Sequence, residues 1–199
     1  MNSKAQAFVE TLKTYKVENW FEVEEYHDDF DSVVFRGFID AVGYRVPTFV
    51  ILDTSIFSMI RLVLSQEEVR DEKRVEVLDY INQLNEDFKL CKYYINSADN
   101  KLYLDVCVPA LDEQFNPTFL LRIMTDLLQD HLNQHMELLV RTMGGLTAEE
   151  LAAVSEQVGS ETTTAKKTTN VNKMATKKTG TKVATKKTGT KTATKKNSH

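Results

Sequence analysis

The chain has 199 residues, and its net charge of −4 averages two oppositely charged pieces. Residues 1–161 hold 14 basic and all 29 acidic residues, a net −15, whereas the remainder holds 11 lysines and no acid. The acidic piece has the length of one ordinary domain. The chain has no run of about 18 apolar residues and begins without an apolar segment, so we expect a cytoplasmic protein with neither a membrane span nor a secretion signal.

Helical spacing of apolar residues predicts a helix over residues 4–16, opened by a capping box of Ser3 and Gln6. Four segments rich in aromatic and β-branched residues follow: Trp20–Tyr26, Ser32–Ala41, Tyr44–Asp53 and Phe57–Leu64. Short polar or glycine-containing breaks separate them, which predicts a meander of antiparallel strands. Because Pro47 has no N–H to donate, the third strand either starts after it or has an edge or a bulge there.

A second capping box, Ser65 with Glu68, predicts a helix that runs to about Leu84. Its inward side chains are Val77, Tyr80, Ile81 and Leu84. The segments Phe88–Ile95 and Lys101–Val108 then flank a polar stretch, which predicts a hairpin with a longer loop.

The last predicted helix has Asn116 as its N-cap, Pro117 at its first position and Gly144-Gly145 beyond its end. At about 27 residues it would be roughly 40 Å long. One apolar stripe runs along it: Leu121, Met124, Leu128, Leu132, His135 and Leu139. This stripe must be buried. Its length favours a self-association surface and hence a homodimer, with burial against a larger sheet as the alternative.

The C-terminal region falls into a linker over 146–162, in which Thr147 and Glu150 could open a short helix, and a low-complexity tail over 163–199. The tail repeats a nine-residue Thr/Lys-rich unit without any aromatic residue, so it cannot bury a core and is predicted to be disordered. Its basic residues are Lys166, Lys167, Lys173, Lys177, Lys178, Lys182, Lys186, Lys187, Lys191, Lys195 and Lys196. They would bind DNA, RNA or other polyanions with strong salt dependence. The alternative is a solubilising tail without a specific role.

The two histidines of the last predicted helix and the two cysteines are expected to have structural roles. His131 and His135 have a metal-compatible spacing, but the metalloprotease Glu and a third ligand are missing. We expect a hydrogen-bonded core histidine or a helix–helix interface at His135, sensitive to mild acid. Cys91 and Cys107 are expected to be small, buried or half-buried hydrophobic residues of a reducing compartment rather than a redox pair.

Six carboxylates lie within ten residues: Glu22, Glu24, Glu25, Asp28, Asp29 and Asp31. Their spacing does not fit a calcium loop. They indicate a solvated hairpin end or, alternatively, an anionic patch that attracts a polycation such as the tail. The chain has no phosphate loop, nucleophile elbow or Cys/His pairing, so we expect no enzyme, no cofactor and no metal.

The order of these elements resembles the YbjN-like family of bacterial proteins, described as sensory transduction regulators, whose fold is similar to that of type III secretion chaperones. The resemblance covers residues 3–143. It rests on Phe35-Arg36-Gly37, Val46-Pro47, Met59-Ile60-Arg61, Arg74 to Asn85, Tyr94-Ile95-Asn96, Leu102-Tyr103-Leu104 and the last helix. It implies a non-enzymatic, protein-binding, commonly dimeric module without catalytic residues.

The sequence therefore predicts an α+β domain over residues 1–145, in the order α-β-β-β-β-α-β-β-α, with a four-strand meander and a hairpin in one antiparallel sheet. We expect a chaperone-like or regulatory domain that binds another protein through an exposed sheet face or groove. The alternative is a nucleic-acid-associated protein that binds DNA or RNA non-specifically through its lysine-rich tail.

Overall fold

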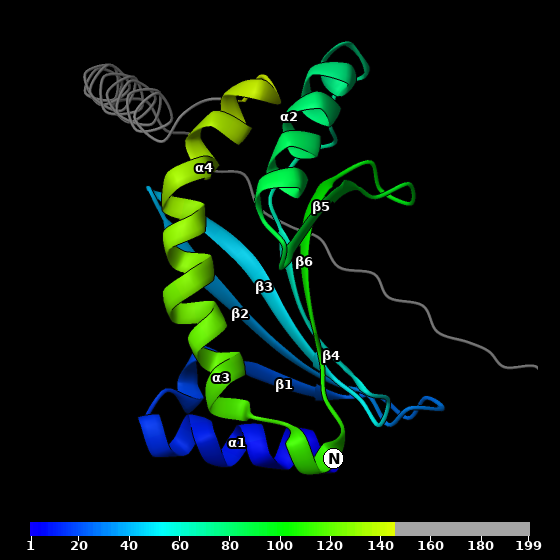
Figure 1. The fold of residues 1–199 in the computed structure, drawn as a ribbon, viewed down its shortest axis with the longest axis vertical. Coiled ribbons are helices and arrows are strands. Elements are labelled where there is room, and N and C mark those ends of the chain that lie inside the picture. The colour runs from blue at the N-terminus through cyan, green and yellow to red at the C-terminus, as the bar shows by residue number, and fades with distance from the viewer. Residues whose placement is uncertain (146–199) are drawn as a thin grey trace, which may run out of the picture. The chain divides into compact units, whose positions relative to one another are not determined.

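A computed structural model describes residues 1–145 of the chain, and these form an α+β domain with one six-stranded antiparallel sheet (Figure 1). The strands are β1 Glu22–Glu25, β2 Val33–Ala41, β3 Tyr44–Leu52, β4 Phe57–Val63, β5 Cys91–Ile95 and β6 Leu102–Pro109. The helices are α1 Ser3–Tyr15, α2 Arg74–Asp87, and a long third helix made of α3 Pro117–Arg122, a π-helical turn Ile123–Leu128 and α4 Gln129–Thr142. The predicted α+β class and element order are confirmed.

The strands lie in the order β1-β2-β3-β4-β6-β5, and every neighbouring pair is antiparallel. This confirms the meander and the hairpin, and it places β6 beside β4. Pro47 lies within β3 opposite Phe38, but the pairing of β3 with β4 stops at Thr48 and Leu62. The edge predicted at Pro47 is therefore present, because β3 continues past the end of its partner strand.

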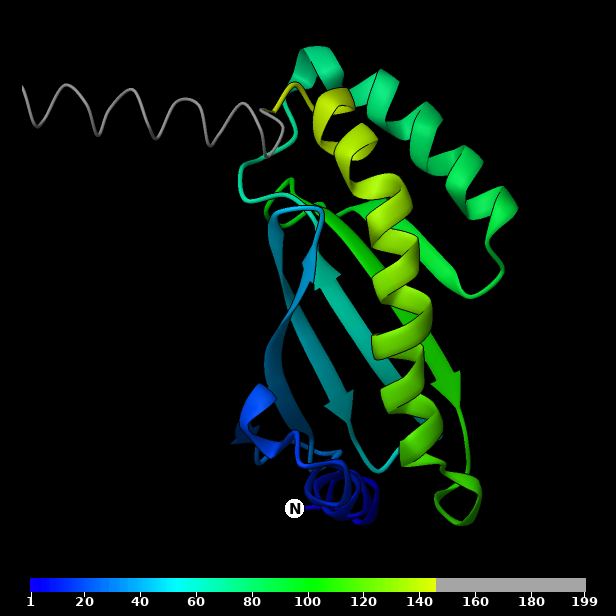
Figure 2. The ribbon, with the colours of Figure 1, turned by 90° about the vertical axis from the view of Figure 1, so that its left-hand side faces the viewer.

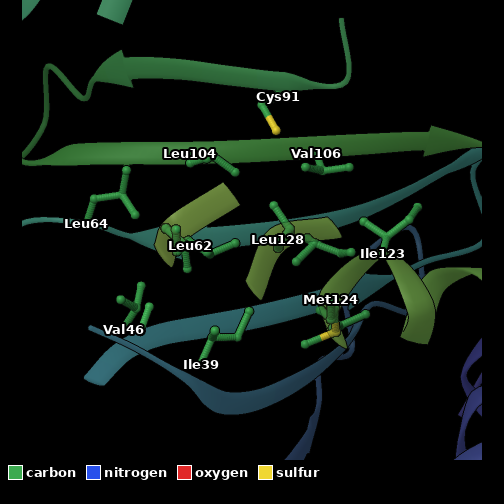
Figure 3. Packing of buried hydrophobic residues seen from close by; sticks show 14 of the residues in the cluster. Ile39, Val46, Leu62, Leu64, Cys91, Leu104, Val106, Ile123, Met124 and Leu128 are labelled. Carbon is green, nitrogen blue, oxygen red and sulfur yellow. The ribbon is translucent and has the colours of Figure 1, made fainter. Parts of the chain in front are cut away.

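The helices lie on one side of the sheet (Figures 1 and 2). The long helix and α2 cover this side, and α1 crosses one end of the sheet. Aliphatic side chains from the strands, such as Ile39, Leu62 and Leu104, face Ile123 and Leu128 of the long helix (Figure 3). The core lies in this single layer between sheet and helices, and the opposite side of the sheet carries no helix of residues 1–145.

The long helix begins and ends where the sequence predicted. The Asn116 side chain accepts a hydrogen bond from the Phe119 N–H, and Pro117 occupies the first helical position. Gly144 follows the last turn with φ +78°, a conformation that costs glycine little. The π-helical turn between α3 and α4 was not predicted.

The apolar stripe of this helix was predicted to be a self-association surface. In the structure it packs in the core of the domain instead. Leu121, Met124, Leu128, Leu132 and Leu139 are all buried, and His135 is half-buried. The six-stranded sheet is wide enough to cover the stripe, which was the alternative. These side chains are therefore not available to a partner.

Two predicted helix starts are wrong. Asn2 rather than Ser3 caps α1, because its side-chain oxygen accepts from the Ala5 N–H while its amide donates to the Asp31 and Leu52 carbonyls. The helix predicted from Ser65 begins only at Arg74. The Ser65 hydroxyl instead accepts a hydrogen bond from the Leu102 N–H of β6, so tertiary contacts hold this segment out of a helix.

Candidate protein-binding surfaces

The side of the sheet that faces away from the helices is here called the open face. Its side chains are exposed or half-buried, whereas the alternate side chains on strands β2 to β6 are mostly buried beneath the helices. Strand register arranges the open face in rows that run across the strands. One row is charged, and apolar and aromatic rows lie on either side of it.

The charged row crosses all six strands in the order Glu22, Arg36, Phe49, Arg61, Asp105 and Lys92. Within it, the Arg61 guanidinium makes two hydrogen bonds of 2.9 Å to the Asp105 carboxylate. This bidentate geometry is the strong form of an Arg–carboxylate pair. The hydrogen bond to Asp105, despite opposing burial, raises the pKa of Arg61.

Arg36 is held by groups from β1 and the turn that follows. Its Nη2 donates to the Tyr26 hydroxyl at 2.9 Å and lies 2.5 Å from the Glu24 carboxylate. The hydrogen bond to Tyr26 and the charge of Glu24 raise the pKa of Arg36. In residues 1–145, Glu22 and Lys92 at the two ends of the charged row form no ion pair.

Each basic side chain of the open face lies over an aromatic ring. The guanidinium of Arg45 is 4.3 Å from the centre of the Phe38 ring, and Arg36 is 5.8 Å from that of Phe49. Arg61 and Lys92 lie 5.7 Å from the rings of Tyr103 and Tyr94, respectively. Cation–π contacts of this kind hold the charges close to the sheet.

The rows on either side of the charged row supply apolar surface. On one side of the charged row lie Val34, Ile51, Met59 and Cys107. On the other side lie Phe38, Pro47, Val63, Tyr103 and Tyr94. Tyr94 and Tyr103 stack with ring centres 5.7 Å apart, and burial, followed by the hydrogen bond to Asp105, raises the pKa of Tyr94 to about 12. A face of mixed apolar and aromatic groups is typical of an interaction surface.

A groove of about 380 Å³ lies where β3 and β4 separate, below the end of α4. Its apolar lining comes from three elements: Val46 and Pro47 of β3, Val63 and Leu64 at the end of β4, and Met136, Val140 and Met143 of the long helix and its C-cap. Glu67, Glu68 and Arg70 line its polar side. The groove exists because the β3–β4 pairing stops at Thr48, so that the strands no longer close the sheet there.

A second hollow of about 550 Å³ lies between β2 and the first half of the long helix, and Arg45 lines both this hollow and the groove. Trp20 and Phe38, both about half exposed, form its aromatic part together with Phe21. Its remaining lining includes Asp40, Arg45 and Gln129 and is therefore more polar than that of the groove. This lining suits a binding site for apolar side chains less well than the groove does.

The two histidines join the long helix to α2 and β5. His131 is buried, and its Nε2 shares a 2.5 Å hydrogen bond with the Tyr93 hydroxyl. His135 is half-buried beside Phe88, and its Nδ1 lies 3.4 Å from the Tyr80 hydroxyl. Burial lowers the pKa of His131 to about 4 and also lowers that of His135.

His135 is thus part of a helix–helix contact inside the domain, and His131 is the more deeply buried of the pair. The helix–helix contact expected at His135 is therefore confirmed, because its ring is hydrogen-bonded to Tyr80 of α2, and His131 is a second hydrogen-bonded histidine in the core. In residues 1–145 no group of three His, Cys, Asp or Glu side chains is arranged to hold a metal ion.

The six clustered carboxylates all lie on β1 and the turn after it, and all are exposed. Asp28 closes the turn by accepting from the Phe30 and Ser32 N–H groups, and the bond from Ser32 is the main reason why its pKa is lowered. The solvated hairpin end is confirmed, whereas the attraction of a polycation stays a prediction.

The cysteines lie on neighbouring strands but on opposite faces of the sheet. Cys91 is buried on the helix side, as expected. The burial expected for Cys107 is wrong, because its position in β6 places it on the open face, where it is exposed. Burial raises the pKa of the Cys91 thiol to about 11 and also raises that of Cys107. The two thiols are free and poorly placed to form a pair.

The predicted linker helix at Thr147 and the eleven lysines of the tail, Lys166 to Lys196, lie outside the described residues.

Sequence reasoning missed the charged row of the open face. The signal was present in strands such as β2, where Val34, Arg36, Phe38 and Asp40 alternate with buried residues. Their alignment across strands depends on register, which no single strand reveals.

None of the helices in residues 1–145 has the length and apolarity that crossing a bilayer would need. The chain matches no family model, and no curated protein or solved structure matches it significantly. The YbjN-like resemblance therefore stays a prediction.

Proposed function

We propose that the chain is a non-enzymatic protein-binding module with a type III secretion chaperone-like domain, which holds an apolar segment of another protein in the groove below α4. The observation that carries this proposal is the convergence of Val46, Val63, Met136, Val140 and Met143 on one open groove. Methionine side chains are flexible and polarisable, so a groove that contains two of them can adapt to different apolar side chains.

The size of the groove supports the same interpretation. A space of about 380 Å³ accommodates a few apolar side chains of an extended or helical segment rather than a whole domain surface. Glu67, Glu68 and Arg70 at its polar side would meet the backbone or polar groups of that segment. The YbjN-like resemblance favours such a chaperone-like or regulatory role.

The test uses a peptide library displayed on phage and selected against the full chain. Selected peptides should be apolar, and they should bind Met143→Asp at least about tenfold more weakly than the parent, because the half-buried Met143 side chain lines the groove. Leu138→Asp is the matched control, since Leu138 is 51% exposed on the same helix. Equal affinity of both variants for the peptides would contradict the groove as the binding site.

The alternative is non-specific nucleic-acid binding through the tail, which the eleven lysines among residues 163–199 favour. Salt separates the two functions, because phosphate contacts weaken steeply with ionic strength and apolar contacts do not. Peptide binding should persist at high salt and without residues 163–199. DNA binding that disappears under both conditions, together with a lack of selected peptides, would favour the alternative.

A further inference from the structure

When the charged row of the open face is laid against a reversed copy of itself, the two rows are complementary. In one direction it carries an acid, a base, an aromatic ring, a base, an acid and a base. We propose that the open face is the interface of a homodimer, in which two copies pack sheet against sheet about a two-fold axis parallel to the strands. Pro47 and Val63 of this face also line the groove, but no residue of the charged row does.

A two-fold axis in this direction reverses the strand order and leaves the position along the strands unchanged. If it passes between β3 and β4, β1 of one copy lies over β5 of the second copy, β2 over β6, and β3 over β4. Glu22 then meets the second copy's Lys92, and Arg36 meets the second copy's Asp105. Phe49 meets the second copy's Arg61, a cation–π pair.

Symmetry makes this match specific. In a closed two-fold dimer the same patch must serve both copies, so a row must be complementary to itself. A two-fold axis across the strands would instead place each strand over its own copy, and Arg36 or Arg61 would approach its own symmetry mate. Like charges brought together at an interface are unfavourable. Only the axis parallel to the strands brings opposite charges together at both ends of the row and an arginine against an aromatic ring at its centre.

The apolar rows match under the same operation. Ile51 meets the second copy's Met59, and Val34 meets the second copy's Cys107, so apolar side chains lie against one another. Phe38 meets the second copy's Tyr103 on the other side of the charged row. Sheets packed face to face in this way keep their strands within about 30° of each other, with about 10 Å between the sheets.

Charge explains why this face, rather than another, can join two copies. Residues 1–145 contain 25 acidic and 14 basic residues, so two copies repel each other over most of their surface. The open face carries four acids, Glu22, Glu24, Asp40 and Asp105, and four bases, Arg36, Arg45, Arg61 and Lys92. The strand residues of this face therefore carry no net charge. Glu22 and Lys92, which form no ion pair within residues 1–145, are the groups that the second copy would pair.

The test is a charge-reversal cycle on the full chain, followed by sedimentation equilibrium at low salt. Glu22→Lys or Lys92→Glu alone creates two like-charge contacts per dimer and should weaken dimerisation about tenfold. The double variant restores opposite charges at both contacts and should recover the parental dissociation constant. Glu113→Lys, the same charge change at an exposed residue outside the open face, should leave dimerisation intact.

A second variant tests the apolar part. Ile51→Asp places a carboxylate at the centre of the interface and should leave a monomer that circular dichroism shows to be folded. Val75→Asp is its control, because Val75 is 71% exposed on α2. A parent that is monomeric at tens of micromolar, a double variant as weak as the single ones, or a dimer that survives Ile51→Asp would each overturn the proposal.

Discussion

The covered and open faces of the sheet are built from alternate residues of the same strands, yet they use different chemistry. The covered face is almost entirely aliphatic and is sealed by the long helix and α2. The open face places arginines and carboxylates between aromatic rings. The covered face therefore holds the domain together, and the open face is free to carry interactions with other molecules.

The few polar groups on the covered side are consistent with this division, because hydrogen bonds satisfy most of them. The Thr48 hydroxyl donates to the Val46 carbonyl, and the buried Lys4 ammonium donates to the Ser55 and Phe57 carbonyls. Burying such groups without partners would be costly. On the open face the same kinds of groups remain in contact with water, so they can exchange partners at little cost.

The largest expected effect comes from paired truncations on β4. Leu62→Ala removes a fully buried side chain of the covered face and should lower the free energy of unfolding by about 2–5 kcal/mol. Val63→Ala, one residue further and half-buried on the open face, should cost less than about 1 kcal/mol. Urea unfolding followed by circular dichroism measures both. Equal losses would contradict the division between the faces.

The second prediction concerns the pH dependence of the free energy of unfolding, which we attribute to His131 on the covered side of the sheet. The pKa of His131 is about 4 in the folded domain and about 6.5 when the chain is unfolded. Between these values the unfolded chain binds more protons, so the stability due to a neutral His131 is complete above pH 6.5 and is lost as pH falls to 4. The loss should reach about 3 kcal/mol.

The control for this prediction is His131→Gln, which removes the titrating ring while keeping a group that can accept from the Tyr93 hydroxyl. Urea unfolding of parent and variant should be compared between pH 7 and pH 5, where carboxylates contribute little. The variant should show the flatter pH dependence, although His135, whose pKa burial also lowers, retains some of it. Identical slopes would show that His131 is not held neutral by burial.

The third prediction tests how much the buried ammonium group of Lys4 contributes to stability. Lys4 is 1% exposed, and its removal in Lys4→Met leaves the Ser55 and Phe57 carbonyls without that donor. Unfolding should become easier by about 1–3 kcal/mol. Lys13→Met, at an exposed position of the same helix, should stay within about 0.5 kcal/mol of the parent. An unchanged free energy of unfolding in Lys4→Met would mean that other donors replace the ammonium.

The smallest effects belong to the ion pairs of the open face. Asp105 is only 14% exposed and accepts from both Arg61 and Tyr94, so Asp105→Asn should cost about 1 kcal/mol. Glu24 and Arg36 are both nearly half exposed, so Glu24→Gln should leave the unfolding midpoint unchanged. These variants should be measured at protein concentrations below dimerisation. If Glu24→Gln lowered the free energy of unfolding as much as Asp105→Asn does, the open face would contribute to the stability of the domain.

Most elements of the fold could be predicted because local signals specify them. Asn116 with Pro117 fixes one helix start, and alternation in β2 fixes the two faces of a strand. The failures occurred where a local signal competed with a distant partner. Ser65 has the spacing of a capping box, but its hydroxyl bonds to the Leu102 N–H, and that contact is formed only when β6 lies beside β4.

The candidate surfaces show the same limit. The sequence by itself determined that the long helix has an apolar stripe, that β1 ends in an acidic turn and that the strands alternate, because each property depends on residues near one another in the chain. Only the tertiary structure decided that the stripe is buried by the sheet and that Glu22, Arg36, Arg61, Asp105 and Lys92 form one row. The reason is register: pairing between strands brings together side chains that no local pattern connects.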